Sequence, residues 1–261
     1  MKKYWAIFKT QVINSLAYPT EIMWRSMAIL IFLWVFTFLW RVAFDNSSTT
    51  ILAGLTLHDT LWYLMLAETI ELSRPRFANT IAQSVKDGSI AYLLCKPYDF
   101  LLYQLSVNAG DTVFRLILTF IFGSALIWGM VGAPPDIWGW PLTLVAFSFG
   151  WLINFSLTAL IGLAAFVVEE VTPFTWIYQK LIFILGGMMI PIDFYPPWLQ
   201  NISKALPFSY VMYGPALLFV SPDLERFATL LAGQLAWVAV LGVLVSVAYR
   251  RGLRRLAING G

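Results

Sequence analysis

The sequence predicts an all-α, polytopic membrane protein, with six transmembrane helices in a single transmembrane domain over residues 1–261. Of the 261 residues, 59% are hydrophobic and only 12% are charged, and the mean hydropathy is +0.74. Soluble domains carry about 25% charged residues, so this chain has too little polar surface for a water-soluble globule. Its 12 Trp and 11 Tyr fit aromatic belts at the two membrane interfaces.

Charge-free apolar runs predict the six spans, because about 20 apolar residues cross the ~30 Å hydrocarbon core. In chain order the spans cover residues 22–43, 57–72, 107–131, 140–168, 174–191 and 227–249. Arg25 and Arg41 flank the apolar run of the first span, and such long side chains extend to the interface. The second span is the weakest of the six, because Glu68 and Glu71 lie toward one of its ends.

The distribution of basic residues predicts that both chain ends lie in the cytoplasm. Six spans put the two termini on the same side, and cytoplasmic segments carry the excess of Lys and Arg. Eleven basic residues then lie on the inner side: Lys2, Lys3, Lys9, Arg74, Arg76, Lys86, Lys96, Arg250, Arg251, Arg254 and Arg255. Only Lys204 and Arg226 lie outside, and the acidic loop at Glu169 and Glu170 has little weight in orientation.

Residues 3–20 predict a helix that lies in the cytoplasmic interface before the first span. Their aromatic and aliphatic side chains recur at helical spacing, with polar residues between them. An amphipathic beginning of the first span is the alternative. Lys9, Gln11 and Asn14 interrupt any early apolar core, so a cleaved signal peptide is not expected.

Residues 74–98, named here the coupling region, predict a short cytoplasmic helix in two parts. Phe77, Ile81 and Val85 form an apolar stripe at four-residue intervals. Asp87-Gly88 breaks the helix, and Lys96-Pro97 ends the second part. Such a charged helix suits docking of another protein, and a surface helix packed under its own bundle is the alternative.

Residues 188–222, named here the external hairpin, are apolar but are cut repeatedly by proline. The prolines are Pro191, Pro196, Pro197, Pro207, Pro215 and Pro222. No continuous span of about 20 residues fits between them. Re-entrant half-helices sheltered by protein do fit, because irregular backbone within a membrane must be covered. A loop on the outer leaflet is the alternative.

Asp111 and Arg115 are four residues apart on the third span and predict an intramembrane ion pair. Glu68 and Glu71, or Glu169 and Glu170, are alternative partners for Arg115, and a proton relay is an alternative role.

One cysteine and one histidine exclude an intramolecular disulfide and a metal site of several Cys and His. With a single cysteine and a single histidine, the chain has few residues suited to catalysis, so it is not expected to be an enzyme. No nucleic-acid partner is expected.

Two motifs resemble those of the ABC type-2 permeases, the membrane subunits of one class of ATP-binding-cassette exporter. The first is the run from Asp87-Gly88-Ser89 through Leu93-Leu94 to Lys96-Pro97. The second runs from Gly186-Gly187 to Pro191, Phe194-Tyr195-Pro196-Pro197-Trp198 and Leu206-Pro207-Phe208. The order of the predicted elements is also similar along nearly the whole chain.

The resemblance implies a permease that pairs with an identical or paralogous permease and docks on two copies of an ABC ATPase subunit. ATP and Mg²⁺ are expected on that subunit, because this chain lacks the phosphate-binding Gly-x-x-x-x-Gly-Lys-Ser/Thr loop. Docking is expected at Arg76, Phe77, Lys86, Asp87, Gly88, Tyr92, Lys96 and Pro97. The external hairpin is expected to be shaped by Pro191, Pro196, Pro197, Trp198 and Pro207.

The predicted function is therefore outward transport of a lipophilic drug, lipid or glycoconjugate through the plasma membrane, in a bacterium by this resemblance. Membrane lipid is the remaining expected partner. An ion-coupled secondary transporter and a membrane scaffold protein are the alternative functions. A secondary transporter favours ionisable residues at mid-span and internal repeats, whereas the acidic residues here lie near span ends.

Overall fold

The computed structural model describes residues 2–17, 19–47 and 49–259, and helices make up 81% of the chain. The helices before the coupling region are α1 (Lys2–Ala17), α2 (Pro19–Asp45) and α3 (Leu57–Ser73). A two-stranded antiparallel hairpin, β1 (Ile51–Leu52) and β2 (Leu55–Thr56), joins α2 to α3. Tyr18 of the predicted interfacial helix and the outermost residues of the predicted domain, 1 and 260–261, lie outside the described residues.

The rest of the chain contains two groups of short helices, one before α6 and one before α12. The coupling region contains α4 (Ala78–Lys86) and α5 (Ile90–Leu94). The long helices that follow are α6 (Phe100–Val131) and α7 (Gly139–Leu163), extended by a 3₁₀ turn η1 (Ala164–Phe166). Helix α8 (Thr172–Leu185) leads to the external hairpin. The hairpin contains η2 (Ile192–Phe194), α9 (Pro197–Ala205), α10 (Pro207–Val211) and α11 (Tyr213–Val220), and α12 (Leu224–Asn259) follows it.

Four of the described helices are long and apolar enough to cross a membrane, which confirms a polytopic α-helical membrane protein. The segments are Met27–Asp45, Phe100–Val131, Gly139–Phe166 and Leu224–Arg254. Helices α3 and α8 have 17 and 14 residues. At 1.5 Å per residue they are shorter than the ~30 Å hydrocarbon core. The count of six spans therefore stays a prediction.

The predicted span 174–191 is too long, because α8 ends at Leu185. Gly187 has a φ of +70°, a left-handed backbone conformation that glycine adopts most readily. A Cβ at this position would lie 2.8 Å from Ile192 Cγ1 and 3.0 Å from the Tyr63 hydroxyl. The close packing at this turn therefore requires glycine and ends α8 inside the bundle.

Helix α3 is the centre of the bundle. Thr56 and Asp59 form a reciprocal capping box at its beginning. Its residues from Leu61 to Ala67 are buried, and the five from Leu61 to Met65 have no exposed surface. A helix that is apolar on all sides belongs in a core, so α3 is enclosed by its neighbours rather than by lipid. Helices α2, α6 and α11 pack against it.

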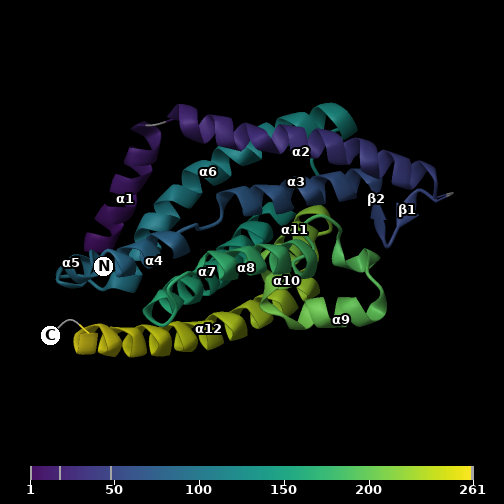
Figure 1. Cartoon of the computed structure of the whole chain (residues 1–261). Coiled ribbons are helices and arrows are strands. Elements are labelled where there is room, and N and C mark those ends of the chain that lie inside the picture. Colours follow the sequence, from purple (N-terminus) through teal and green to yellow (C-terminus); the bar gives the residue numbers. More distant parts are fainter. Residues whose placement is uncertain (1, 18, 48, 260–261) are drawn as a thin grey trace.

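The two ends of the molecule differ in their elements (Figure 1). The beginning of α1, the helices α4 and α5, and the end of α12 gather at one end, which we name the coupling end. The β1–β2 hairpin and α9 lie at the opposite end. The beginning of α1 and the end of α12 therefore lie at the same end as the coupling region, and their predicted cytoplasmic side stays a prediction.

The external hairpin is folded back into the bundle. Helix α11 is buried from Gly214 to Val220 and packs against α3 and α7, whereas α9 lies at the surface. Pro197 and Pro207 occupy the first turns of α9 and α10, where a missing backbone N–H leaves no hydrogen bond unmade. Pro191 is buried, and Pro196 and Trp198 are exposed. Protein therefore shelters α11 but not α9, and re-entry of the hairpin into the membrane stays a prediction.

Candidate functional site

The coupling region folds into two short helices, as the sequence predicts. Helix α4 ends at Lys86, and Gly88 has a φ of +74° in the turn before α5. The Asp87 carboxylate accepts a hydrogen bond from the Ser89 backbone N–H at 2.9 Å. Hydrogen bonds from Ser89 hold the pKa of Asp87 below its ordinary value, so this carboxylate is charged at neutral pH.

The apolar stripe of α4 packs against the bundle of the same chain. Phe77 is only 5% exposed, and its ring stacks on Phe155 of α7 with 4.9 Å between the centroids. Ile81 joins the same buried cluster, together with Val245 of α12. The Phe77 side chain is therefore occupied inside the bundle, and its predicted contact with an ATPase stays a prediction. The predicted alternative, a helix packed under its own bundle, describes this face of α4.

The opposite face of the coupling region is open and polar. Among the other predicted docking residues, Lys96 is partly buried and six are exposed: Arg76, Lys86, Asp87, Gly88, Tyr92 and Pro97. Tyr92 is 70% exposed, and Lys96 Nζ lies 4.6 Å from its ring centroid. A hydrogen bond with Tyr98 raises the pKa of Lys96, which keeps this ammonium charged. The exposed face thus combines fixed charges with an aromatic ring, a composition that suits protein contacts.

An ion pair joins the coupling region to the loop before α8. Lys86 Nζ lies 3.0 Å from a carboxylate oxygen of Glu170, and both side chains are about half exposed. The Glu170 carboxylate also accepts hydrogen bonds from the Thr172 hydroxyl and backbone N–H. The Thr172 hydroxyl, then Lys86 and the Thr172 backbone N–H, lower the pKa of Glu170 to about 2. Glu170, predicted as an alternative partner for Arg115, therefore pairs with Lys86 instead, 84 residues away in the sequence.

Helix α1 also contacts the coupling region. Lys3 Nζ donates a hydrogen bond to the Pro97 carbonyl oxygen at 2.7 Å. The Asp99 backbone N–H donates to the Tyr4 hydroxyl at 2.9 Å, directly before α6. Helix α1 packs along α6, so it is attached to the bundle and not only to the interface. Its predicted location in the membrane interface stays a prediction.

Asp111 and Arg115 form an ion pair on α6, with 3.3 Å between Arg115 Nη2 and Asp111 Oδ2. The other oxygen of Asp111 accepts hydrogen bonds from Gln11 at 2.8 Å and from Ser15 at 3.2 Å, both on α1. The pair therefore connects two helices rather than lying isolated on one. No local pattern predicts these partners, because about 100 residues separate them from Asp111.

A second ion pair is buried where α3 meets the coupling region. Arg74 Nε lies 2.7 Å from Glu71 Oε1, and both side chains are less than one tenth exposed. The guanidinium also lies over the Tyr178 ring of α8, 5.9 Å from its centroid. Glu68 is buried one turn earlier on α3. Glu68 and Glu71 weakened the prediction of a second span. The structure shows that Glu71 pairs with Arg74 at the coupling end.

The chain matches the family described as ABC-2 family transporter protein over residues 12–260. This match covers nearly the whole chain, so the protein belongs to that family. Among curated proteins no match is found. Family membership makes this chain a membrane permease component of an ABC transporter, and the family implies association with an ABC ATPase subunit.

Proposed function

We propose that this chain is the permease subunit of an ATP-driven exporter and that the open face of the coupling region docks on a separate ABC ATPase. The main observation in support is that α4 has one face packed on the bundle and one face exposed. Phe77 and Ile81 fix one side of α4 to the bundle, while Arg76, Lys86 and Asp87 remain exposed on or beside it. A docked partner then has a rigid, charged surface to hold.

The contacts of the coupling region provide a route for motion into the bundle. Phe77 packs on α7, and its cluster includes Val245 of α12. Lys86 is paired with Glu170 beside α8, and the Pro97 carbonyl is bonded to Lys3 of α1. A displacement of α4 and α5 by the ATPase would therefore act on four helices at once. Packed helices shift between discrete arrangements, which suits alternating exposure of a transport pathway.

In this proposal two permeases, identical or paralogous, assemble with two ATPase subunits. ATP and Mg²⁺ bind to the ATPase subunits, and the coupling end faces the cytoplasm of a bacterial cell. The external hairpin then lies at the outer side, and its buried α11 supports the pathway from that side. A lipophilic drug, a lipid or a glycoconjugate suits the apolar, aromatic-rich bundle as cargo.

Charge reversal on the docking face tests the proposal. The double variant K86E/K96E is expected to lower association with a co-expressed ABC ATPase at least about tenfold, because docking charges of the wrong sign repel the partner. The matched control K204E reverses a lysine on α9, at the opposite end of the molecule. It should leave association unchanged.

The Lys86–Glu170 pair needs a second control, because K86E also breaks it. The charge swap K86E/E170K keeps an ion pair but still reverses the charge on α4. Association that stays low in the swap indicates direct contact of Lys86 with the ATPase. Undiminished capture of the ATPase by K86E/K96E, with normal membrane insertion, would contradict docking at this face.

A further inference from the structure

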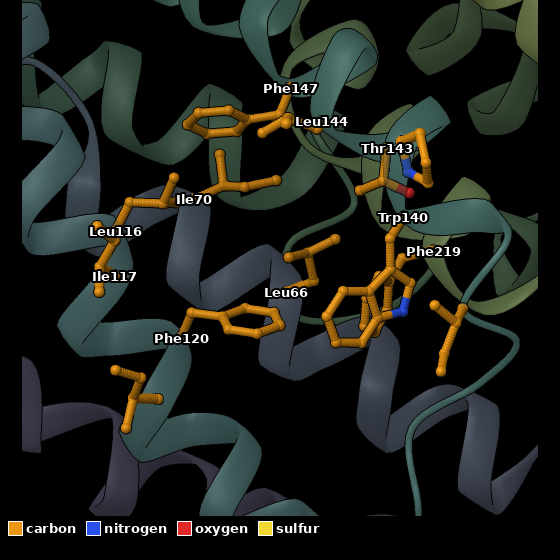
Figure 2. A pocket seen from close by; sticks show the side chains of 13 residues that line it. Leu66, Ile70, Leu116, Ile117, Phe120, Trp140, Thr143, Leu144, Phe147 and Phe219 are labelled. Atoms are coloured by element: carbon orange, nitrogen blue, oxygen red, sulfur yellow. The ribbon is translucent and has the colours of Figure 1, made fainter.

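An open cavity of about 410 Å³ lies between the external hairpin and the first turns of α12. Its volume is within the range of about 300–1,000 Å³ typical of pockets for small molecules. Charged residues of both signs line it: Lys204, Asp223, Glu225 and Arg226. The pocket between α3, α6 and α7 differs from it, because hydrocarbon side chains make up nearly all of that lining and give a ligand no orientation (Figure 2).

Two of these charges have no ionic partner within the described part of the chain. Glu225 and Arg226 are exposed neighbours in the first turn of α12. Among the residues that the structure describes, the Glu225 carboxylate makes no hydrogen bond or ion pair. The Arg226 guanidinium donates a hydrogen bond to the Ser221 carbonyl oxygen at 2.9 Å and meets none of the described carboxylates. The lining therefore offers a ligand an unpaired charge of each sign.

The other two charges are already used inside the chain. Lys204 Nζ lies 3.6 Å from Asp193 Oδ1. The Asp223 carboxylate accepts hydrogen bonds from the backbone N–H groups of Glu225 and Arg226, at 3.4 and 3.1 Å. Because these interactions hold Lys204 and Asp223 in place, a ligand in the cavity meets the side chains of Glu225 and Arg226 as its principal charged contacts.

The floor of the cavity is apolar and fixed. Gly214 of α11 lies so close to α12 that a Cβ there would be 2.4 Å from Leu230 Cδ1, and the Tyr210 ring packs in the same way on Gly233. Gln234 Nε2 also donates a hydrogen bond to the Tyr210 carbonyl oxygen at 2.9 Å. Gly214, Tyr210 and Leu230 all belong to the lining. The floor is therefore formed before any ligand binds.

The charges and the floor lie at different depths in the membrane. Glu225 and Arg226 directly precede the charge-free run from Phe227 to Tyr249, so they lie at the membrane surface. Leu230 is four residues beyond Arg226, about 6 Å deeper along α12. The cavity is thus charged at the surface and apolar toward the hydrocarbon core, which fits an amphiphilic ligand.

The two unpaired charges specify the polar part of such an amphiphile. A guanidinium binds phosphate through paired N–H donors, and a carboxylate attracts an ammonium group. The neighbouring positions of Arg226 and Glu225 suit a ligand that carries both groups close together. Phospholipids with a zwitterionic head group have this composition, and they are abundant at a membrane surface.

We propose that this cavity binds a zwitterionic phospholipid, with its phosphate on Arg226 and its ammonium group on Glu225. The glycerol and the first acyl carbons then lie on the floor at Leu230 and Tyr210. An anionic phospholipid without an ammonium group binds more weakly, because it leaves the Glu225 carboxylate facing a negative charge. The site lies far from the coupling end, and binding there depends on neither the direction nor the cargo of the proposed exporter.

The test uses the full chain in nanodiscs of equal parts phosphatidylcholine and phosphatidylglycerol, in which one lipid or the other carries a diazirine beside its ester group. Cross-links are mapped by mass spectrometry. Phosphatidylcholine is expected to label residues 209–214 and 223–230 about fivefold more than Ile137 and Trp138. These reference residues are exposed at the same membrane surface, because the adjacent Gly139 packs against Pro222. Phosphatidylglycerol should show no such enrichment.

Charge-neutral variants test the two assigned contacts. E225Q and R226Q should each lower the phosphatidylcholine enrichment about threefold or more, because the ammonium group or the phosphate loses its partner. The controls E169Q and R251Q neutralise exposed charges of the same kinds away from the cavity and should keep the enrichment. Equal labelling by the two lipids, or cavity labelling no higher than at Ile137 and Trp138, would overturn the proposal. Full enrichment in both E225Q and R226Q would also overturn it.

Discussion

The coupling region and the external hairpin are both helical segments interrupted by proline or glycine, yet the structure uses them in opposite ways. Helix α4 buries one apolar stripe and leaves its other face open. Helix α11 is enclosed by the bundle from Gly214 to Val220. The first segment is built to present a surface, and the second is built to fill the interior. An interruption in a helix therefore does not by itself indicate a docking site.

The two segments are also secured by different interactions. Ion pairs at Lys86–Glu170 and Arg74–Glu71 hold the coupling end. Tyrosine hydroxyls hold the external hairpin: Tyr63 donates to the Gly187 carbonyl at 2.6 Å, and Tyr213 donates to the Asp193 carboxylate at 2.8 Å. The half-exposed Lys86–Glu170 pair can exchange partners when another protein docks. The buried hydrogen bond from Tyr63 fixes the external hairpin, in which Asp193 also pairs with Lys204 at 3.6 Å.

The largest expected effect is at the buried pair of the coupling end. R74M leaves the Glu71 carboxylate buried without its partner, which costs about 3–5 kcal/mol of unfolding free energy. Chemical unfolding in mixed detergent micelles measures the loss. The double variant E71Q/R74M removes both charges and should recover most of it. Equal unfolding free energies of R74M and the native chain would show that Arg74 does not stabilise the buried Glu71 carboxylate.

A pair of glycine substitutions compares the two regions directly. G187A places a Cβ against Ile192 and Tyr63 in a left-handed turn, and it should cost about 2–4 kcal/mol. G88A has a similar φ but open space around it, so it should cost only about 1–2 kcal/mol. The same unfolding measurement ranks the two variants. A larger loss of unfolding free energy in G88A than in G187A would contradict tight packing around Gly187 and open space around Gly88.

The smallest effect concerns the Glu170 carboxylate, whose folded pKa of about 2 lies below its ordinary value. A lowered pKa means that the stabilising interactions are complete above pH ~4.5 and are lost as the pH falls toward 2. T172V and K86Q should each raise this pKa, because the Thr172 hydroxyl and Lys86 both stabilise the charged carboxylate. Carboxyl ¹³C shifts of labelled protein in nanodiscs measure both. An unchanged Glu170 pKa in T172V would contradict the assigned hydrogen bond from the Thr172 hydroxyl.

Much of the architecture could be predicted because it depends on local composition. The break at Asp87-Gly88, the half-helices of the external hairpin and the long apolar helices follow from glycine, proline and the absence of charge. The spacing of Asp111 and Arg115 also predicts their observed ion pair. Each of these signals lies within a few residues of the feature that it predicts.

The rest depends on contacts between distant parts of the chain. The stripe of Phe77 and Ile81 fits a partner groove and the chain's own bundle equally well, and only the position of Phe155 decides between them. The pairing of Lys86 with Glu170 crosses 84 residues. The burial of α3 could not be distinguished from exposure to lipid, because both environments favour apolar side chains.

The most direct test of the docking face uses Cys95, the single cysteine of the chain, which is exposed in the coupling region. A membrane-impermeant maleimide should label Cys95 in inside-out vesicles but not in intact cells. A co-assembled ABC ATPase should then protect it at least about tenfold, because docking covers this surface. Labelling from outside intact cells, or full labelling in the assembled complex, would contradict the central claim.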